Sequence, residues 1–266
     1  MTAPSETNPP SARRPLLSAE VLFTPADFDT LPGRDLSRTA CVVFDVLRAT
    51  TSMITALANG AEAILPVGSI SEALAIRHER PEVLLAGERE GVRIRAAQTG
   101  GVDFDFGNSP REFTPEKVRG KTLVTTTTNG TRALRACLGA QTTLVGAFLN
   151  LRSVTDWIER VRPENLIVVC SGTFEQAAYE DVLAAGALLE RLAPDLAGTQ
   201  LADTVAIVRQ IWGLARANPA EAVRHARNAR KLLSRPELAD DVPFSLRQDT
   251  VVLTAVMGRD GTVRKM

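Results

Sequence analysis

Several compact polar motifs follow apolar, strand-like segments, and the first of them is segment 45–51. In this segment an acid, Asp45, is followed three positions later by Arg48 and then by the hydroxyls of Thr50 and Thr51. A carboxylate of this kind binds Mg²⁺ or attacks phosphorus, and an arginine can hold a phosphoryl group through paired hydrogen bonds. The structural alternative for Asp45 is a helix N-cap, where a carboxylate accepts backbone N–H groups. The motif therefore indicates either phosphate chemistry or a cap.

Two further polar motifs follow along the chain. Glu88 and Arg89 come after the apolar segment 82–86, so Glu88 is a candidate second metal ligand and Arg89 a candidate anion clamp. A turn-like segment then offers the Asn108 amide and the Ser109 hydroxyl to phosphate or carboxylate oxygens. Both motifs also have a structural explanation, the first as an exposed charge run and the second as a surface turn.

The segment 125–131, TTTTNGT, has the most unusual composition in the chain. Asn-Gly is typical of a hairpin turn, but the helical spacing of the apolar residues that follow favours a strand–loop–helix junction. At such a junction a glycine lets the backbone approach a ligand, and hydroxyl, amide and helix-terminal N–H groups bind anions. The candidates here are Thr128, Asn129, Gly130 and Thr131.

Acids also occur at the starts of predicted helices. Glu180 and Asp181 open one helix and Asp203 opens the next, which are positions where acids stabilise the helix dipole. Any of these acids would also suit a magnesium site. Asp240 and Asp241, by contrast, are expected in a solvated loop.

The elements that position these motifs alternate between strand and helix, which predicts an α/β protein. The expected arrangement is three-layer α/β/α, with a largely parallel or mixed sheet covered on both faces. The carboxyl ends of parallel strands share one edge, so the polar motifs are expected to converge there. Strands are predicted at 20–23, 39–45, 63–67, 82–86, 122–127, 142–147, 166–170 and 250–256, and helices at 50–59, 70–78, 132–137, 153–161, 181–192, 202–215 and 219–233.

Composition limits the classes of partner. The 266 residues carry 31 basic and 31 acidic side chains, so no overall field draws the protein to nucleic acid or an anionic membrane, and a small molecule is the expected partner. No apolar stretch approaches the roughly 18 residues of a membrane span. Residues 1–15 lack the apolar core of a signal peptide and are expected to be disordered, and a cytoplasmic location is expected.

Residues 16–266 are expected to form one α/β domain. The irregular section 91–120 is the place where this domain would divide into two closely packed halves. For the assembled protein a homo-oligomer is expected, with a dimer as the first choice.

Cysteine and histidine usage excludes several mechanisms. Three cysteines lie in apolar segments without metal-ligand spacing, and the two histidines lie in predicted surface helices. Ser-His-Asp hydrolysis and His-rich metal sites are therefore excluded. Cys41 and Arg48 enclose six residues where a cysteine phosphatase needs five, and Leu47 stands where haloacid dehalogenase-type enzymes need a second acid.

In their order, the motifs DVLRATT, GERE, FDFGNSP, TTTTNGT, and SGTF followed by YED resemble those of the 2-phosphosulfolactate phosphatase family, from about residue 41 to residue 203. The resemblance implies Mg²⁺-dependent hydrolysis of (2R)-phospho-3-sulfolactate to 3-sulfolactate and phosphate, a step towards coenzyme M. It also implies a set of functional residues: Asp45, Arg48, Thr50, Thr51, Glu88, Arg89, Asn108, Ser109, Thr127, Thr128, Asn129, Gly130, Thr131, Glu180 and Asp181.

The resulting hypothesis places Mg²⁺ between the substrate phosphate and carboxylates drawn from Asp45, Glu88 and Asp181. Arg48 and the loop donors would neutralise charge that develops during phosphoryl transfer, and Arg89 would hold the sulfonate or carboxylate. The attacking group is either Asp45 or a water molecule on the metal. The alternatives are a phosphatase for another phosphorylated hydroxy acid and a non-catalytic module that binds a phosphorylated acid.

Overall fold

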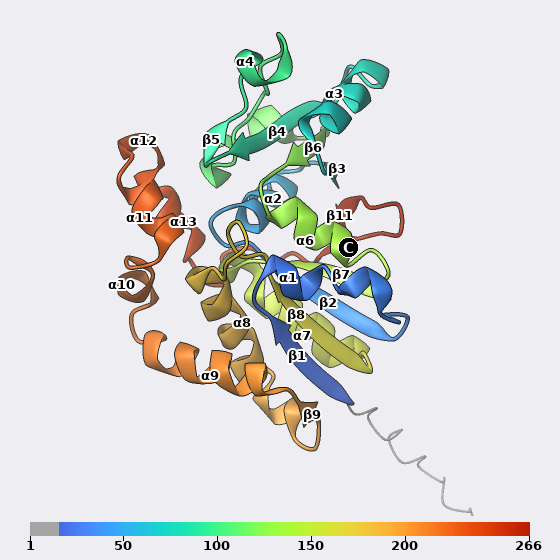
Figure 1. The fold of residues 1–266 in the computed structure, drawn as a ribbon, viewed down its shortest axis with the longest axis vertical. Coiled ribbons are helices and arrows are strands. Elements are labelled where there is room, and N and C mark those ends of the chain that lie inside the picture. Colours follow the sequence, from blue (N-terminus) through green and yellow to red (C-terminus); the bar gives the residue numbers. More distant parts are fainter. Residues whose placement is uncertain (1–15) are drawn as a thin grey trace, which may run out of the picture.

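Eleven strands of the computed structural model, which describes residues 16–266, form one mixed sheet with helices on both faces (Figure 1). Their order across the sheet is β5-β4-β6-β3-β11-β10-β7-β2-β8-β1-β9. The expected α/β class with a mixed sheet is therefore confirmed. The disorder expected for residues 1–15 lies outside the described residues, and the division near 91–120 stays a prediction.

The strands are β1 (Ser18–Leu22), β2 (Thr39–Phe44), β3 (Ala63–Pro66), β4 (Leu84–Arg89), β5 (Val92–Arg93), β6 (Thr122–Thr126), β7 (Thr142–Gly146), β8 (Asn165–Cys170), β9 (Gln200–Leu201), β10 (Ala255–Met257) and β11 (Val263–Lys265). The α-helices are α1 (Pro25–Phe28), α2 (Ala49–Ala58), α3 (Ile70–Glu79), α4 (Ala96–Thr99), α5 (Pro115–Val118), α6 (Gly130–Ala136), α7 (Leu151–Val161), α8 (Tyr179–Arg191), α9 (Asp203–Ala215), α10 (Pro219–Val223), α11 (Arg227–Leu233), α12 (Pro236–Ala239) and α13 (Asp241–Ser245). Four short 3₁₀ turns complete them: η1 (Leu31–Gly33), η2 (Pro110–Glu112), η3 (Phe148–Asn150) and η4 (Ala193–Leu196).

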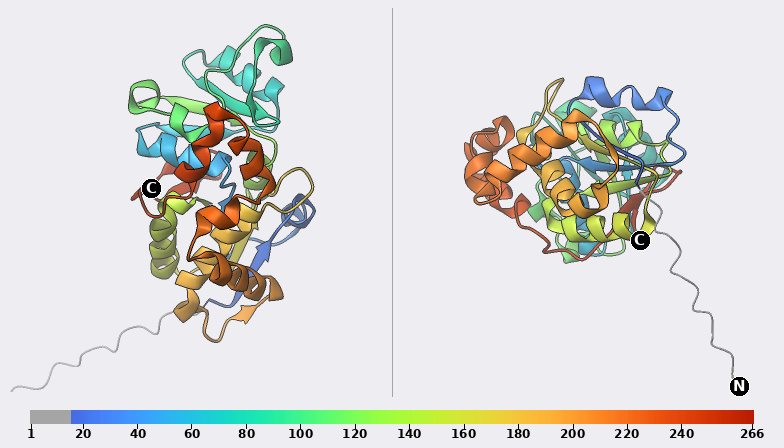
Figure 2. Two further views of the ribbon diagram at one scale, coloured as in Figure 1. Left: turned by 90° about the vertical axis from the view of Figure 1, so that its left-hand side faces the viewer. Right: turned by 90° about the horizontal axis from the view of Figure 1, so that it is seen from below.

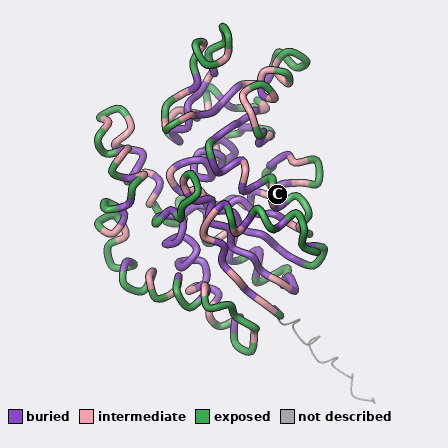
Figure 3. Tube along the Cα trace, viewed as in Figure 1, coloured by how far each residue is buried: buried purple, intermediate pink, exposed green. Residues whose placement is uncertain are grey.

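The central strand β2 shows how the layers form. Its side chains alternate between the two faces, as the period of two in a strand requires. Val42 and Phe44 pack with α7, α8 and α9, whereas Cys41 and Val43 pack with α2 and α6 on the other face. Figure 3 shows buried segments at the centre of the molecule and exposed ones at its outside, and Figure 2 shows the same ribbon from two further directions. The strand is buried along its whole length, which explains its continuous apolar sequence.

The sheet consists of two parallel sections joined by an antiparallel hairpin. The strands β4, β6 and β3 are parallel to one another, as are β7, β2, β8 and β1. Between the two sections lie β10 and β11, which pair antiparallel to each other, to β7 and to β3. The predicted strand at 250–256 is therefore wrong in extent, whereas the antiparallel pairing agrees with the mixed sheet that was expected. Residues before Ala255 instead bond to η3, where Val251 N–H donates to Leu149 O.

The helical region after α9 also differs from the expectation. The single helix predicted over 219–233 is two helices, α10 and α11, with a break at residues 224–226. The helices α10 to α13 run along one side of the molecule, in orange and red in Figure 1, from α9 towards β5. The break lets α11 lie against the loop after β8, where its polar side chains make contacts described below. No helix within residues 16–266 is both long and apolar enough to cross a membrane.

Candidate active site

Polar residues from the ends of β2, β4, β6 and β8 line one pocket, so the expected convergence is confirmed. Six of the residues singled out in the sequence contribute to its wall, and α11 supplies the opposite side. The lining residues that sequence reasoning named are Asp45, Arg48, Glu88, Asn108, Thr128 and Asn129. The pocket thus lies outside the carboxyl ends of the strands, where open α/β sheets bind ligands.

Asp45 follows the last residue of β2 and lies partly exposed in this pocket. Its Oδ1 accepts the N–H of Ala49 at 3.0 Å, so it also helps to cap α2. Burial raises the pKa of Asp45 to about 6; the Ala49 hydrogen bond opposes this, and the nearby Glu88 carboxylate adds to the rise. The two sequence interpretations of Asp45, a cap and a reactive carboxylate, are therefore compatible, because its two oxygens differ in their surroundings.

Gly130, the first residue of α6, makes this arrangement possible. A Cβ atom at position 130 would lie 2.5 Å from Asp45 Oδ2 and 2.7 Å from the Cβ of Ala49. Only a glycine lets the start of α6 approach the carboxylate this closely.

Glu88 lies inside β4 and is held by backbone donors from two loops. Its Oε1 accepts the N–H and the hydroxyl of Thr128 at 2.8 and 2.9 Å, and its Oε2 accepts the Gly91 N–H at 2.6 Å. Because β4 continues to Arg89, the two neighbours point to opposite sides of the strand. Arg89 donates to the Thr126 carbonyl and hydroxyl and does not line the pocket.

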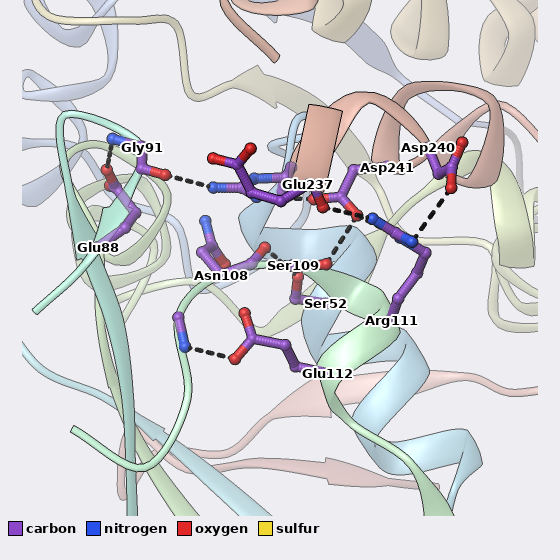
Figure 4. Close-up of polar contacts among 12 residues, drawn as sticks. Ser52, Glu88, Gly91, Asn108, Ser109, Arg111, Glu112, Glu237, Asp240 and Asp241 are labelled. Carbon is purple, nitrogen blue, oxygen red and sulfur yellow. Dashed lines mark hydrogen bonds and ion pairs between the residues drawn. The ribbon is translucent and has the colours of Figure 1, made fainter. Parts of the chain in front are cut away.

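The guanidinium of Arg48 is buried, with 3% of its side chain exposed. Its Nη1 donates to Asp241 Oδ2 at 2.7 Å, and its Nη2 donates to the Gly91 carbonyl at 2.9 Å. The other oxygen of Asp241 accepts from the Ser109 hydroxyl at 2.7 Å and from Arg111 Nε at 2.8 Å, as Figure 4 shows. Asp241 is fully buried, so the expectation of a solvated loop was wrong for this residue.

Asp181 and Glu180 lie behind the pocket at the start of α8, and each has at most 1% of its surface exposed. Asp181 accepts from Val46 N–H at 2.8 Å, Ser171 Oγ at 3.1 Å and Gly172 N–H at 3.2 Å. Burial raises the pKa values of both acids, and the charges of the neighbouring carboxylates add to the rise. Asp181 therefore joins the loops after β2 and β8 and does not face the pocket.

The remaining hydroxyl candidates bond to the backbone that shapes the loops. The Thr50 hydroxyl accepts the Asp45 N–H at 3.0 Å, and the Thr51 hydroxyl donates to Val46 O at 2.9 Å. The Thr127 hydroxyl accepts the Thr131 N–H at 3.2 Å. These side chains, with Ser109, position the pocket residues and are not part of its wall.

Sequence reasoning missed the wall formed by α11. Arg227, Asn228 and Lys231 line the pocket from one face of this helix. The Asn228 amide donates to Glu180 Oε1 and to the Thr173 hydroxyl, both at 2.6 Å, which fixes the helix against the loop after β8. The basic composition of this stretch was the available signal, but it did not indicate which residues face inward.

The acids of the site are close enough to repel one another, yet their geometry is not that of a preformed metal cage. No group of three or more His, Cys, Asp or Glu residues within the described part of the chain is arranged to hold a metal ion. The buried Glu180 Oε2 has no hydrogen-bond partner there. Such an uncompensated oxygen beside Asp45 leaves negative charge in the region that a cation would stabilise.

Comparison with known proteins places the chain in a family. A family model described as 2-phosphosulpholactate phosphatase matches residues 27–258. A protein named "Probable 2-phosphosulfolactate phosphatase" from Caldanaerobacter subterraneus subsp. tengcongensis is 40% identical over 173 residues, which cover 64% of this chain and 68% of the relative. A protein of the same name from Pseudothermotoga lettingae is 34% identical over 236 residues, which cover 88% of this chain and 96% of the relative. A relative of the same name from Thermotoga petrophila is 37% identical over 212 residues (80% and 86%). The motif resemblance is thereby confirmed, and the chain belongs to the 2-phosphosulpholactate phosphatase family.

Proposed function

We propose that this protein is a phosphoric monoester hydrolase that converts (2R)-phospho-3-sulfolactate to 3-sulfolactate and phosphate. The observation that carries the proposal is the pocket of Asp45, Arg48 and Glu88, built from the motifs that place the chain in its family. We further propose a role in coenzyme M formation, a location in the cytoplasm and a homodimer, and sedimentation of the purified protein would test the last of these.

We propose Mg²⁺ as the cofactor, held by Asp45 and Glu88 on the pocket side. The donor set fits this ion, because Mg²⁺ keeps several waters and is usually bound by only one or two carboxylates together with substrate phosphate oxygens. A site with fewer than three acidic ligands in the described part of the chain is therefore compatible with Mg²⁺. When bound, the ion would neutralise charge on the phosphate. Asp181 does not line the pocket, so its proposed part is to hold Val46 and Gly172 in place.

The protein groups have separable tasks in this proposal. Arg48 lines the pocket with a buried guanidinium whose direction is fixed by Asp241 and the Gly91 carbonyl, and its remaining N–H donors would serve the phosphate. The Asn108 and Asn129 side chains border the same space and offer neutral donors. Phosphoryl transfer depends mainly on such positioning and on electrostatic stabilisation. Asp45, with a pKa of about 6, is largely ionised at neutral pH and is the carboxylate on which turnover depends.

The arrangement favours an enzyme over a module that only binds a phosphorylated acid. Asp45, Glu88 and Glu90 all line the pocket, and carboxylates repel an anionic ligand unless a cation lies between them. A simple anion-binding site would have no need for these acids.

The test is release of inorganic phosphate from (2R)-phospho-3-sulfolactate, 2-phospholactate and 3-phosphoglycerate, each measured with Mg²⁺ and with a chelator. We expect the highest kcat/KM for phosphosulfolactate, with Mg²⁺ only. Turnover of another ester alone would reassign the substrate and keep the phosphatase. Binding without turnover of any ester would instead support the non-catalytic module.

A further inference from the structure

The wall of the pocket formed by α11 carries two cations, Arg227 and Lys231, that form no ion pair with an acidic residue in the described part of the chain. Lys231 is half-buried, and its ammonium group makes no ion pair or hydrogen bond with any residue in 16–266. Arg227, one turn earlier on the same face, donates only to neutral groups: the Gln176 side chain at 2.6 Å and the Thr173 carbonyl at 2.9 Å. The third cation of the pocket, Arg48, is neutralised by Asp241.

The position of Lys231 relative to the acids is also defined. Its Cε and Nζ lie 3.6 and 3.8 Å from the place where a Cβ on Gly91 would stand. Gly91 has a φ of +79° and joins the two sides of the pocket, because its N–H donates to Glu88 and its carbonyl accepts from Arg48. Lys231 therefore lies beside the β4–β5 turn that bonds both Glu88 and Arg48.

The presence in one pocket of acids suited to a metal ion and of an unpaired cation indicates a ligand with two kinds of anionic group. A phosphate bound through a cation at Asp45 and Glu88 does not need a second basic wall. The Lys231 ammonium lies at the pocket without a hydrogen-bond partner from residues 16–266, and an anion that reaches it gains a charge-assisted hydrogen bond. A carboxylate or a sulfonate on the same small molecule has the required charge.

We propose that Lys231 binds the acidic group of the substrate other than the phosphate, and that it sets the preference for phosphorylated hydroxy acids over simple phosphate esters. The proposal rests on the phosphatase function proposed above, and it assigns to Lys231 the task that the sequence had suggested for Arg89. Arg227 contributes charge to the same wall, but its main contacts hold α11 against the loop after β8. Lys231 is therefore the residue to change, because its removal leaves those contacts intact.

The experiment compares Lys231→Met and Lys231→Arg with Arg230→Met, a control that removes a neighbouring charge which does not line the pocket. The substrates are (2R)-phospho-3-sulfolactate, 2-phospholactate and isopropyl phosphate, which share a secondary phosphate ester but carry two, one and no further acidic groups. Lys231→Met should raise KM for phosphosulfolactate by about ten- to hundredfold, the range of one hydrogen bond to a charged group, and leave isopropyl phosphate unchanged. Lys231→Arg should recover most of the loss, and Arg230→Met should match the wild type.

The pattern of loss also identifies the acid that Lys231 binds. A loss for both acidic substrates assigns the carboxylate to Lys231, and a loss for phosphosulfolactate alone assigns the sulfonate. An equal loss for all three esters, or none, would overturn the proposal. If the wild type hydrolyses none of them, the proposed function fails. Calorimetric binding of 3-sulfolactate then tests separately whether Lys231 binds an acidic group. If only Lys231→Met binds 3-sulfolactate more weakly than the wild type, the assignment of Lys231 as the basic subsite stands. If Lys231→Met binds as tightly as the wild type, or the wild type does not bind, the assignment is wrong.

Discussion

The guanidinium of Arg48 and the carboxylate of Asp241 form a buried ion pair, with 2.7 Å between Nη1 and Oδ2, although 193 positions separate the two residues in the chain. Asp241 is fully buried and also accepts from Ser109, so the pair joins the loop after β2, the turn at η2 and the start of α13. Arg48 thus has a fixed direction before any ligand arrives, a form of preorganisation that lowers the cost of binding charge.

The first prediction concerns this pair. Asp241→Asn keeps the shape of the side chain but removes the charge that orients Arg48, so we expect kcat/KM for phosphate release to fall about ten- to hundredfold. The free energy of unfolding should also fall, by about 1–3 kcal/mol, because a buried guanidinium loses its counter-charge. Kinetics should be measured well below the melting temperature, so that unfolding does not contribute.

The neighbour Asp240 provides the control for this prediction. It is exposed, and its Oδ2 forms an ion pair with Arg111 Nη1 at 3.3 Å. Because exposed ion pairs contribute little, Asp240→Asn should change neither activity nor stability measurably. Wild-type kinetics in Asp241→Asn would show that Arg48 does not need its partner.

The second prediction uses a matched pair of glycines. Gly130→Ala places a methyl group 2.5 Å from Asp45 Oδ2 and should displace that carboxylate, with a loss of activity of about tenfold or more. Gly139→Ala meets no atom within 4 Å and should leave activity unchanged. Alanine is the better helix former, so local propensity alone would favour Gly130→Ala. Equal activity of the two variants would contradict the close contact with Asp45.

The third prediction concerns the loss of folding stability that follows when Asp45 is ionised. Its pKa is raised from 3.8 to about 6, so the folded state binds the proton more tightly than the unfolded state. Stability from this group is present below about pH 4 and is lost as the pH rises through 6. In metal-free protein at pH 8, Asp45→Asn should therefore be more stable than the wild type by up to about 3 kcal/mol, although it should lack phosphatase activity.

Denaturant titrations of the wild type and Asp45→Asn between pH 4 and pH 8 would measure this difference. The gap should shrink as the pH falls through 6, because the wild-type carboxyl becomes neutral. Asp156→Asn, in an exposed pair with Arg152, is the control and should show no such trend. A gap that stays constant with pH would contradict the raised pKa of Asp45.

The fourth prediction concerns Mg²⁺ and the acids around Asp45. A cation that binds the folded state alone raises its stability by mass action, by about 2.7 kcal/mol at a hundredfold excess over Kd. Mg²⁺ should therefore raise the melting temperature of the wild type, and a chelator should reverse both this rise and phosphate release. Asp45→Asn should lose most of the shift, whereas Asp156→Asn should keep it. An equal shift in all three proteins would place the ion elsewhere.

Sequence patterns predicted the parts of this molecule that local chemistry determines. The alternation of strands and helices predicted the sheet and the edge where its polar ends meet, because apolar periodicity reflects burial directly. The helix predicted at 70–78 is present as α3, and the hydroxyl of Ser69, just before it, accepts the Glu72 N–H at 3.0 Å. Asp45, Glu88 and Thr128 were found for the same reason, since each follows or ends a recognisable strand.

The parts that sequence missed depend on contacts between distant segments. Asp241 looked like a surface acid because its partner Arg48 lies far away in the chain, and no local pattern reports such a pair. Arg89 was assigned to the site because β4 was expected to end before it. In the structure β4 continues to Arg89. Because successive side chains in a strand point to opposite faces, Arg89 points away from Glu88. Which face of α11 points inward depends on the break after Val223 and on contacts such as those of Asn228 with Thr173 and Glu180, which lie about 50 positions away in the chain.

The hairpin of β10 and β11 has a consequence for how the protein is made. Asp45 belongs to the parallel section on one side of this hairpin and Glu88 to the section on the other, so the two acids share a pocket only when the hairpin joins the sections. A ribosome completes all the other described strands before it reaches residue 255. Each parallel section can therefore fold early, but the nascent chain has no complete pocket until β10 and β11 pair with β7 and β3. A product that stops short of residue 255 should fold partly and lack phosphatase activity.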